Sequence, residues 1–119
     1  MTPDIHRLPG HAAGRSRAVI HGGFAWTVAT ARDKSRDLAG QTADALEQIA
    51  ATLAECGTGP SRLLTATVYV TDISRKEEMD RVWRGWIPAD GWPQRTCVQA
   101  ALAPGDLVEI VVMAALPSR

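Results

Sequence analysis

Strong charge of one sign and long apolar runs are both missing from this 119-residue chain. The formal net charge is zero, so no basic surface is expected of the kind that binds nucleic acid or acidic membranes. No apolar run is long enough to cross a bilayer. Residues 1–15 also lack the apolar middle segment of a secretory signal. We therefore expect a cytosolic protein that binds neither nucleic acid nor membranes.

Cysteines and metal-ligating patterns are scarce as well. Cys56 and Cys97 are the only two cysteines, too few for a disulfide framework, and they have no metal-ligand spacing. His6, His11 and His21 show no such spacing either. We expect two reduced thiols and no metal site.

The length of the chain suggests one domain with a modest core. Residues 1–14 contain Pro3, Pro9, Gly10 and Gly14 and no apolar period, which predicts a flexible N-terminal tail. A single domain is then expected over residues 15–119.

Apolar patterns and turn residues predict seven elements in that domain. Two strands flank Gly22 and Gly23, a hairpin signal. A helix follows, with Asp37 as N-cap and Gly57 as C-terminal stop. Strand 63–71 alternates, with Leu64, Ala66, Val68 and Val70 on one face.

A second helix is predicted after Ser74, which has capping-box spacing with Glu77. Its core face is a helical stripe, and the four members of this stripe are Met79, Val82, Trp83 and Trp86. Strands at 94–100 and 107–116 complete the chain, joined by the turn "LAPGD".

This order predicts an α+β domain with a mixed sheet and two helices on one face. The other face would carry residues such as Tyr69, Val111 and Met113, too apolar a surface to leave in water. The chain has no further element to cover it. The sequence therefore predicts a homo-oligomer whose sheets face inward.

Arg95 stands at the head of the strand "QRTCVQA" and shares a face with Cys97. Glu109 lies in the last strand, which we expect to be a neighbour of that strand. A charge inside a strand is costly when buried alone. Two interpretations stay open. In the first, Arg95 has a structural role only: it makes an ion pair with Glu109 or points to solvent. In the second, Arg95 binds a ligand carboxylate, for which its planar guanidinium is suited.

The run "QRTCVQAALAPGDLVEIVVMAA" resembles the signature of the Rid family (YjgF/YER057c/UK114), usually close to P-x-R-[ST]-x-V-E-V-x-x-L-P-x-x-x-x-V-E-I. The segments "RSRAVIHGG", "DLAGQTADALEQIAATLAECG" and "SRLLTATVYVTDISRKEEMDRVW" resemble the family's earlier elements in order. The similarity covers residues 15–116. It implies a chorismate-mutase-like fold assembled as a homotrimer with pockets at the subunit interfaces.

Typical members of this family hydrolyse 2-imino or 2-aminoacrylate acids to 2-keto acids and ammonia, without metal or cofactor. By resemblance, Arg95 matches the arginine that binds the substrate carboxylate, and Glu109 matches the glutamate associated with the attacking water. Cys97 matches a frequent pocket cysteine. The implied partner is a small carboxylate-bearing imine or enamine.

Several positions depart from the family's pattern. Ala29 and Thr30 stand where many members have Gly-Gln, Arg15 replaces a common tyrosine, and Asp80 replaces a frequent asparagine. Ala29 narrows the space beside the backbone. We count Arg15, Ala29 and Thr30 among the expected substrate-binding residues.

Two tryptophans have open assignments. Trp92 precedes Arg95 by three residues in a turn and either roofs the pocket or packs in an interface. Trp26 shares a face with Phe24 and Val28 and is a candidate core residue.

Three functions remain as hypotheses. They are an imine or enamine deaminase, a specialised relative acting on a larger intermediate of a pathway, and a non-enzymatic trimer that binds a small ligand.

Overall fold

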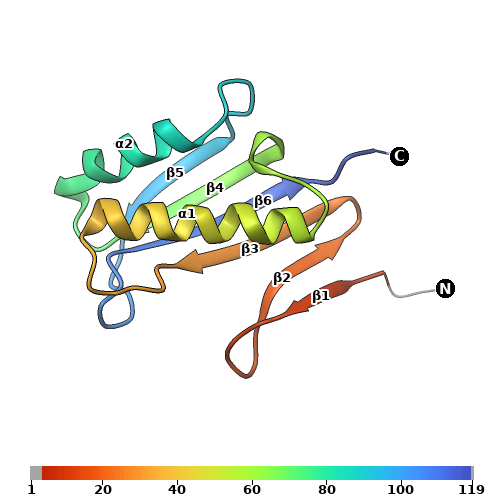
Figure 1. Ribbon diagram of the computed structural model, residues 1–119, viewed down its shortest axis with the longest axis horizontal. Coiled ribbons are helices and arrows are strands. Elements are labelled where there is room, and N and C mark those ends of the chain that lie inside the picture. Colours follow the sequence, from red (N-terminus) through yellow and green to blue (C-terminus); the bar gives the residue numbers. More distant parts are fainter. Residues whose placement is uncertain (1–3, 119) are drawn as a thin grey trace.

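Residues 4–118 form one six-stranded mixed sheet covered on one face by two helices (Figure 1). The computed structural model describes residues 4–118. Within these residues the strand order is β1-β2-β3-β6-β4-β5, and only β4 and β5 pair in parallel. The elements are β1 (His6–Pro9), β2 (Ser16–His21), β3 (Phe24–Thr30), α1 (Leu38–Glu55), β4 (Leu63–Val70), α2 (Lys76–Trp86), β5 (Gln94–Gln99) and β6 (Val108–Ala115). This architecture confirms the α+β class expected from the sequence.

The predicted signals around the first hairpin and α1 are confirmed. Gly22 and Gly23 have φ of 60° and 88°, which suits the tight turn between β2 and β3. The Asp37 side chain accepts a hydrogen bond from the Gly40 N–H at 2.9 Å and caps α1. Gly57, with φ of 86°, follows the helix end.

The predicted capping box of the second helix is wrong. Asp72 Oδ1 accepts hydrogen bonds from both the backbone N–H and the hydroxyl of Ser74. Ser74 therefore lies in a short 3₁₀ turn (Ile73–Arg75), and α2 begins only at Lys76. A carboxylate two residues upstream is the stronger acceptor and takes the local donors first.

The core lies between the sheet and the two helices. Ala66, Val68 and Val70 of β4 are buried there, as their alternation predicts. Leu64 is instead 40% exposed, because a register shift between Leu63 and Thr65 places Leu63 in the core in its stead. The predicted stripe of α2 is confirmed: Met79 and Trp83 are buried, while Val82 and Trp86 pack against the cluster from its edge.

The N-terminal segment contains a strand, so the expectation of a flexible tail over 1–14 is corrected for this part. His6–Pro9 pairs antiparallel with β2, with His6 opposite Ile20. Residues 1–3 of the expected tail lie outside the described residues. An edge strand needs no apolar alternation and tolerates proline at its end, so composition could not reveal it.

The expectation that the strand of Arg95 neighbours the strand of Glu109 is also wrong. β4 lies between β5 and β6. The connection from β4 through α2 to β5 is a crossover, which places β5 parallel to β4 at the sheet edge. A short turn between β5 and β6 does not require the two strands to pair.

The face of the sheet away from the helices is apolar and uncovered in the single chain. Its exposed members are Phe24, Trp26, Val28, Val98 and Val111, between 36% and 42% exposed. Trp26 is therefore not a core residue of the chain. We call these five residues the open face. None of the helices in residues 4–118 combines the length and hydropathy needed to cross a membrane.

Candidate functional site

Arg95 is the second residue of β5, the strand at one edge of the sheet, and its side chain points towards α2. Register places it beside Ala66, on the helix face. Its guanidinium lies 5.2 Å from the Trp83 ring centroid, and Nη1 approaches Met79 Sδ at 3.7 Å. The side chain is only 18% exposed, so the guanidinium is held by an aromatic face and a thioether.

The charge partner of Arg95 is Asp80. Arg95 Nη2 donates to Asp80 Oδ1 at 2.6 Å, and Lys76 Nζ donates to Oδ2 of the same carboxylate at 2.6 Å. Burial raises the pKa of Asp80, but the hydrogen bonds from Lys76 and Arg95 outweigh it and hold the pKa below its ordinary value. Asp80 is therefore a carboxylate shared between two cations.

This pairing corrects the expected contact between Arg95 and Glu109. Glu109 pairs with Tyr69 in register, on the face of the sheet opposite to Arg95. Their strands are two spacings apart, about 9–10 Å. The two side chains cannot meet within one chain.

Cys97 lies two residues after Arg95 on the same face of β5, beside Val68 of β4, and is half-buried. Burial raises the pKa of its thiol, and the positive charges of Lys76 and Arg95 only partly oppose this effect. The thiol is therefore protonated at neutral pH, which argues against a thiolate nucleophile here.

Glu109 lines a separate open pocket of about 330 Å³ near the ends of β3 and β6. Four of the sequence-predicted site residues meet in it: Arg15, Ala29, Thr30 and Glu109. Further walls come from the loop between β1 and β2, from side chains of α1 and from the loop between β5 and β6. The structure thus separates the four residues of this Glu109 pocket from Arg95. We call Lys76, Asp80, Trp83 and Arg95 the Arg95 cluster.

Asp106 is a further pocket residue that the sequence did not single out. It is 8% exposed, lines the Glu109 pocket and pairs with Lys34. Lys34 Nζ also donates to Thr30 Oγ1 at 3.2 Å. The sequence placed Asp106 only in a turn, and the long-range contact with Lys34 was the missing information.

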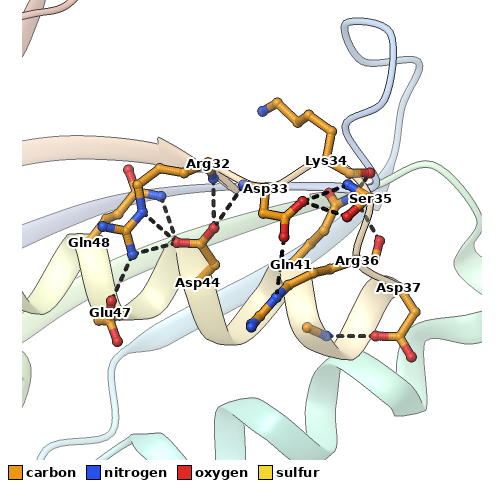
Figure 2. Close-up of polar contacts among 11 residues, drawn as sticks. Arg32, Asp33, Lys34, Ser35, Arg36, Asp37, Gln41, Asp44, Glu47 and Gln48 are labelled. Carbon is orange, nitrogen blue, oxygen red and sulfur yellow. Dashed lines mark hydrogen bonds and ion pairs between the residues drawn. The ribbon is translucent and has the colours of Figure 1, made fainter.

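The loop after β3 is held to α1 by one buried carboxylate (Figure 2). Asp44 Oδ2 accepts from the backbone N–H of Arg32 at 2.7 Å and of Asp33 at 3.2 Å, and Oδ1 accepts from Arg32 Nε at 2.8 Å. Gln48 Nε2 donates to the Thr30 carbonyl at 2.7 Å. These contacts fix the end of β3, and with it Thr30, beside the pocket.

Trp92 lies outside the Glu109 pocket and is 76% exposed. Its neighbour Gly91 packs directly on the chain at Ser61, where an added Cβ would lie 2.6 Å from the Ser61 Cα. The loop before β5 therefore needs glycine at 91, and it presents Trp92 outward.

Among residues 4–118, no three His, Cys, Asp or Glu side chains gather in a way that could hold a metal ion.

Comparison with known proteins identifies the family. Residues 11–116 match the family model described as Endoribonuclease L-PSP. A RutC family protein of Haemophilus ducreyi is 37% identical over 103 residues, which cover 85% of this chain and 88% of that relative. RutC family protein YoaB of Escherichia coli is 34% identical, covering 85% of this chain and 90% of the relative.

Solved structures agree with these matches. NMB1025 of Neisseria meningitidis, a member of the YjgF protein family, superposes with a TM-score of 0.89 at 35% identity and covers 98% of both chains. Rv2704 of Mycobacterium tuberculosis, a member of the YjgF/YER057c/UK114 family, gives a TM-score of 0.82 at 30% identity and covers 94% of this chain and 99% of its own. The chain belongs to the Rid (YjgF/YER057c/UK114) family, as its sequence motifs indicate.

Proposed function

We propose that this protein is a cofactor-independent deaminase that hydrolyses small 2-imino acids to 2-keto acids and ammonia. The observation that carries the proposal is Arg95, a mostly buried guanidinium with a fixed orientation at the exposed edge of the sheet. A planar fork held in this way is suited to a ligand carboxylate. Family membership supports the same chemistry.

In the proposed reaction, Arg95 holds the carboxylate while Glu109 orients a water molecule and accepts its proton. The water oxygen bonds to the imine carbon and forms a carbinolamine. Transfer of a proton to nitrogen then expels ammonia and leaves the ketone. For the protonated imine the balance is iminium plus water to ketone plus ammonium.

The reaction requires Arg95 and Glu109 to come from different chains, because within one chain they lie on opposite faces of the sheet. We propose a homotrimer whose open faces pack inward and whose interfaces join the Arg95 cluster of one subunit to the Glu109 pocket of the next. The exposed apolar residues of the open face support this assembly.

A small carboxylate ligand fits the chain better than RNA does, despite the description of the family model. The chain has equal numbers of basic and acidic residues, 13 of each, and nucleic-acid binding depends on net positive contacts. We also propose a cytosolic location, which the two free thiols support.

Two departures from the family's pattern favour a second candidate, a specialised relative that takes a different ligand. Asp80 occupies one edge of the Arg95 guanidinium, and Ala29 and Thr30 line the Glu109 pocket. A ligand must fit both departures from the family's pattern.

The test is ammonia release from 2-imino acids generated in place by an amino acid oxidase. We expect the purified protein to accelerate ammonia formation above the spontaneous rate in water. Equal rates with and without the protein, across several side-chain sizes, would end the deaminase assignment. Saturable ligand binding without catalysis would instead indicate the third hypothesis, a binding trimer.

A further inference from the structure

The Arg95 cluster has an unusual charge balance for a carboxylate receptor. Two cations, Arg95 and Lys76, share one carboxylate, Asp80, through contacts of 2.6 Å each. Asp80 is 12% exposed in its side chain and Arg95 is 18% exposed. Water therefore screens this pair less than it screens an ion pair at the surface.

A ligand carboxylate bound to Arg95 must come close to the carboxylate of Asp80. The guanidinium is planar, and Asp80 holds one end of it at Nη2, so a second carboxylate on the fork lies only a few ångströms away. Like charges at that separation repel. Asp80 therefore makes the site less favourable for a plain monocarboxylate than a neutral residue at position 80 would, and Lys76 offsets this effect only in part.

A ligand that carries a cation beside its carboxylate avoids that penalty. Its positive nitrogen offsets the repulsion and is attracted to Asp80, while its carboxylate still binds Arg95. We propose that Asp80 is a specificity-determining residue that makes the site prefer zwitterionic ligands, with a cationic nitrogen next to the carboxylate, over plain monocarboxylates.

This inference rests on the proposed function and names its ligand class more closely. A protonated 2-imino acid carries both charges, whereas the 2-keto acid product carries only the carboxylate. Asp80 would therefore favour the protonated substrate over the product and assist product release. An asparagine at this position could not make the distinction, because it is neutral.

Trp83 and Met79 explain why Asp80 keeps this influence on the ligand. They hold the guanidinium from other sides, by the ring at 5.2 Å and the sulfur at 3.7 Å. Arg95 thus has little freedom to turn away from Asp80 when a ligand arrives. The neighbouring thiol of Cys97 is neutral and adds no compensating charge.

The experiment compares two stable probes by calorimetry, the zwitterion L-2-aminobutanoate and the monoanion 2-oxobutanoate. The ratio of their dissociation constants is measured for wild type and Asp80→Asn. We expect wild type to favour the zwitterion. We expect Asp80→Asn to move the ratio towards the monoanion by about tenfold or more, the effect of one unit charge within a few ångströms.

Lys76→Met is the matched variant. It removes a positive charge from the same carboxylate but leaves the contact between Asp80 and Arg95. We expect it to move the ratio in the opposite direction, towards the zwitterion. This variant also decides the question if Asp80→Asn does not fold.

The outcomes separate the two proposals. If wild type hydrolyses 2-imino acids but neither variant changes the ratio, Asp80 does not select the ligand and only this inference fails. If folded wild type and Asp80→Asn bind neither probe and release no ammonia, the deaminase proposal fails and the inference fails with it.

Discussion

At the scale of single residues, experiment must separate the structural role of Arg95 from its proposed role in binding a ligand carboxylate. Its guanidinium takes part in an ion pair with Asp80 and stacks on Trp83, so it has a structural role whatever else it does. The same contacts orient the fork at the sheet edge. A purely structural role and a ligand-binding role predict different effects of Arg95 substitutions on stability and on activity.

Arg95→Ala should affect both stability and activity. Asp80 keeps Lys76 as a partner, so we expect a loss of only about 1–3 kcal/mol in the free energy of unfolding. We expect the kcat/KM for imino-acid hydrolysis to fall about thirty-fold to a thousand-fold, the effect of losing a charge-assisted bidentate contact. Thermal melting and ammonia release measure the two.

Two variants control that measurement. Arg95→Lys should rescue activity poorly, because a point charge cannot reproduce the fork. Arg84→Ala removes an exposed ion pair with Glu77 and should change neither property. A folded Arg95→Ala protein with near-normal turnover would contradict the assignment.

That Trp92 lies near the bound ligand remains a prediction. It is exposed in the single chain, whereas Trp83 contacts Arg95 directly. If a subunit interface builds the pocket around the loop before β5, Trp92→Phe should remove most of any ligand-induced change in tryptophan fluorescence. If Trp83→Phe removes that change and Trp92→Phe leaves it intact, Trp92 has no part in the site.

At the scale of elements, the junction between β3 and α1 depends on Asp44. Its buried carboxylate accepts hydrogen bonds from the backbone N–H groups of Arg32 and Asp33 (Figure 2). Burial raises the pKa of Asp44, but the hydrogen bonds from these two residues outweigh it and lower the pKa overall. The loop that holds the end of β3 therefore depends on the charged form of Asp44.

Asp44→Asn should destabilise the protein by about 1–3 kcal/mol at neutral pH, because the amide cannot replace all the acceptor contacts. Since the folded pKa is depressed, the stabilisation is complete above the ordinary carboxyl pKa of about 3.9 and is lost as pH falls through the folded value. The gap between wild type and variant should therefore shrink in acid. Denaturant unfolding over that range measures it.

Asp90→Asn serves as the control for this pH series, since Asp90 is an exposed carboxylate in the loop before β5. Its stability curve should follow that of wild type. A difference between wild type and Asp44→Asn that stays constant down to strong acid would show that charge at Asp44 is not involved.

At the scale of the whole molecule, the open face is the strongest argument for assembly. Phe24, Trp26 and Val28 follow one another along β3, and Val98 and Val111 extend the same surface. The phenylalanine and tryptophan rings already contact each other, with centroids 6.1 Å apart. An apolar surface of this extent is typical of an interface.

Light scattering should return about three times the 12.8 kDa chain mass. Val111→Glu should dissociate this trimer, because a charge would be buried in the interface without a partner. Ile73→Glu places the same charge at an exposed apolar residue outside the sheet and should leave the mass unchanged. A well-folded wild-type monomer at micromolar concentration would rule out both the assembly and a shared site.

Local signals in the sequence were sufficient wherever a residue's neighbours along the chain decide its structure. Asp37, the Gly22-Gly23 turn and the stripe of α2 follow from capping, positive φ and helical spacing, and all three are confirmed. The motif around Arg95 and Glu109 likewise sufficed to indicate the family. These features depend on contacts within a few residues.

The tertiary structure decided what depends on contacts between distant residues. Strand order separated Arg95 from Glu109, because the crossover through α2 inserts β4 between their strands. Asp80, on α2, became the partner of Arg95, and Asp106 joined the Glu109 pocket through Lys34. Periodicity assigns a side chain to a face of its own element, but it carries no information on which element packs against that face.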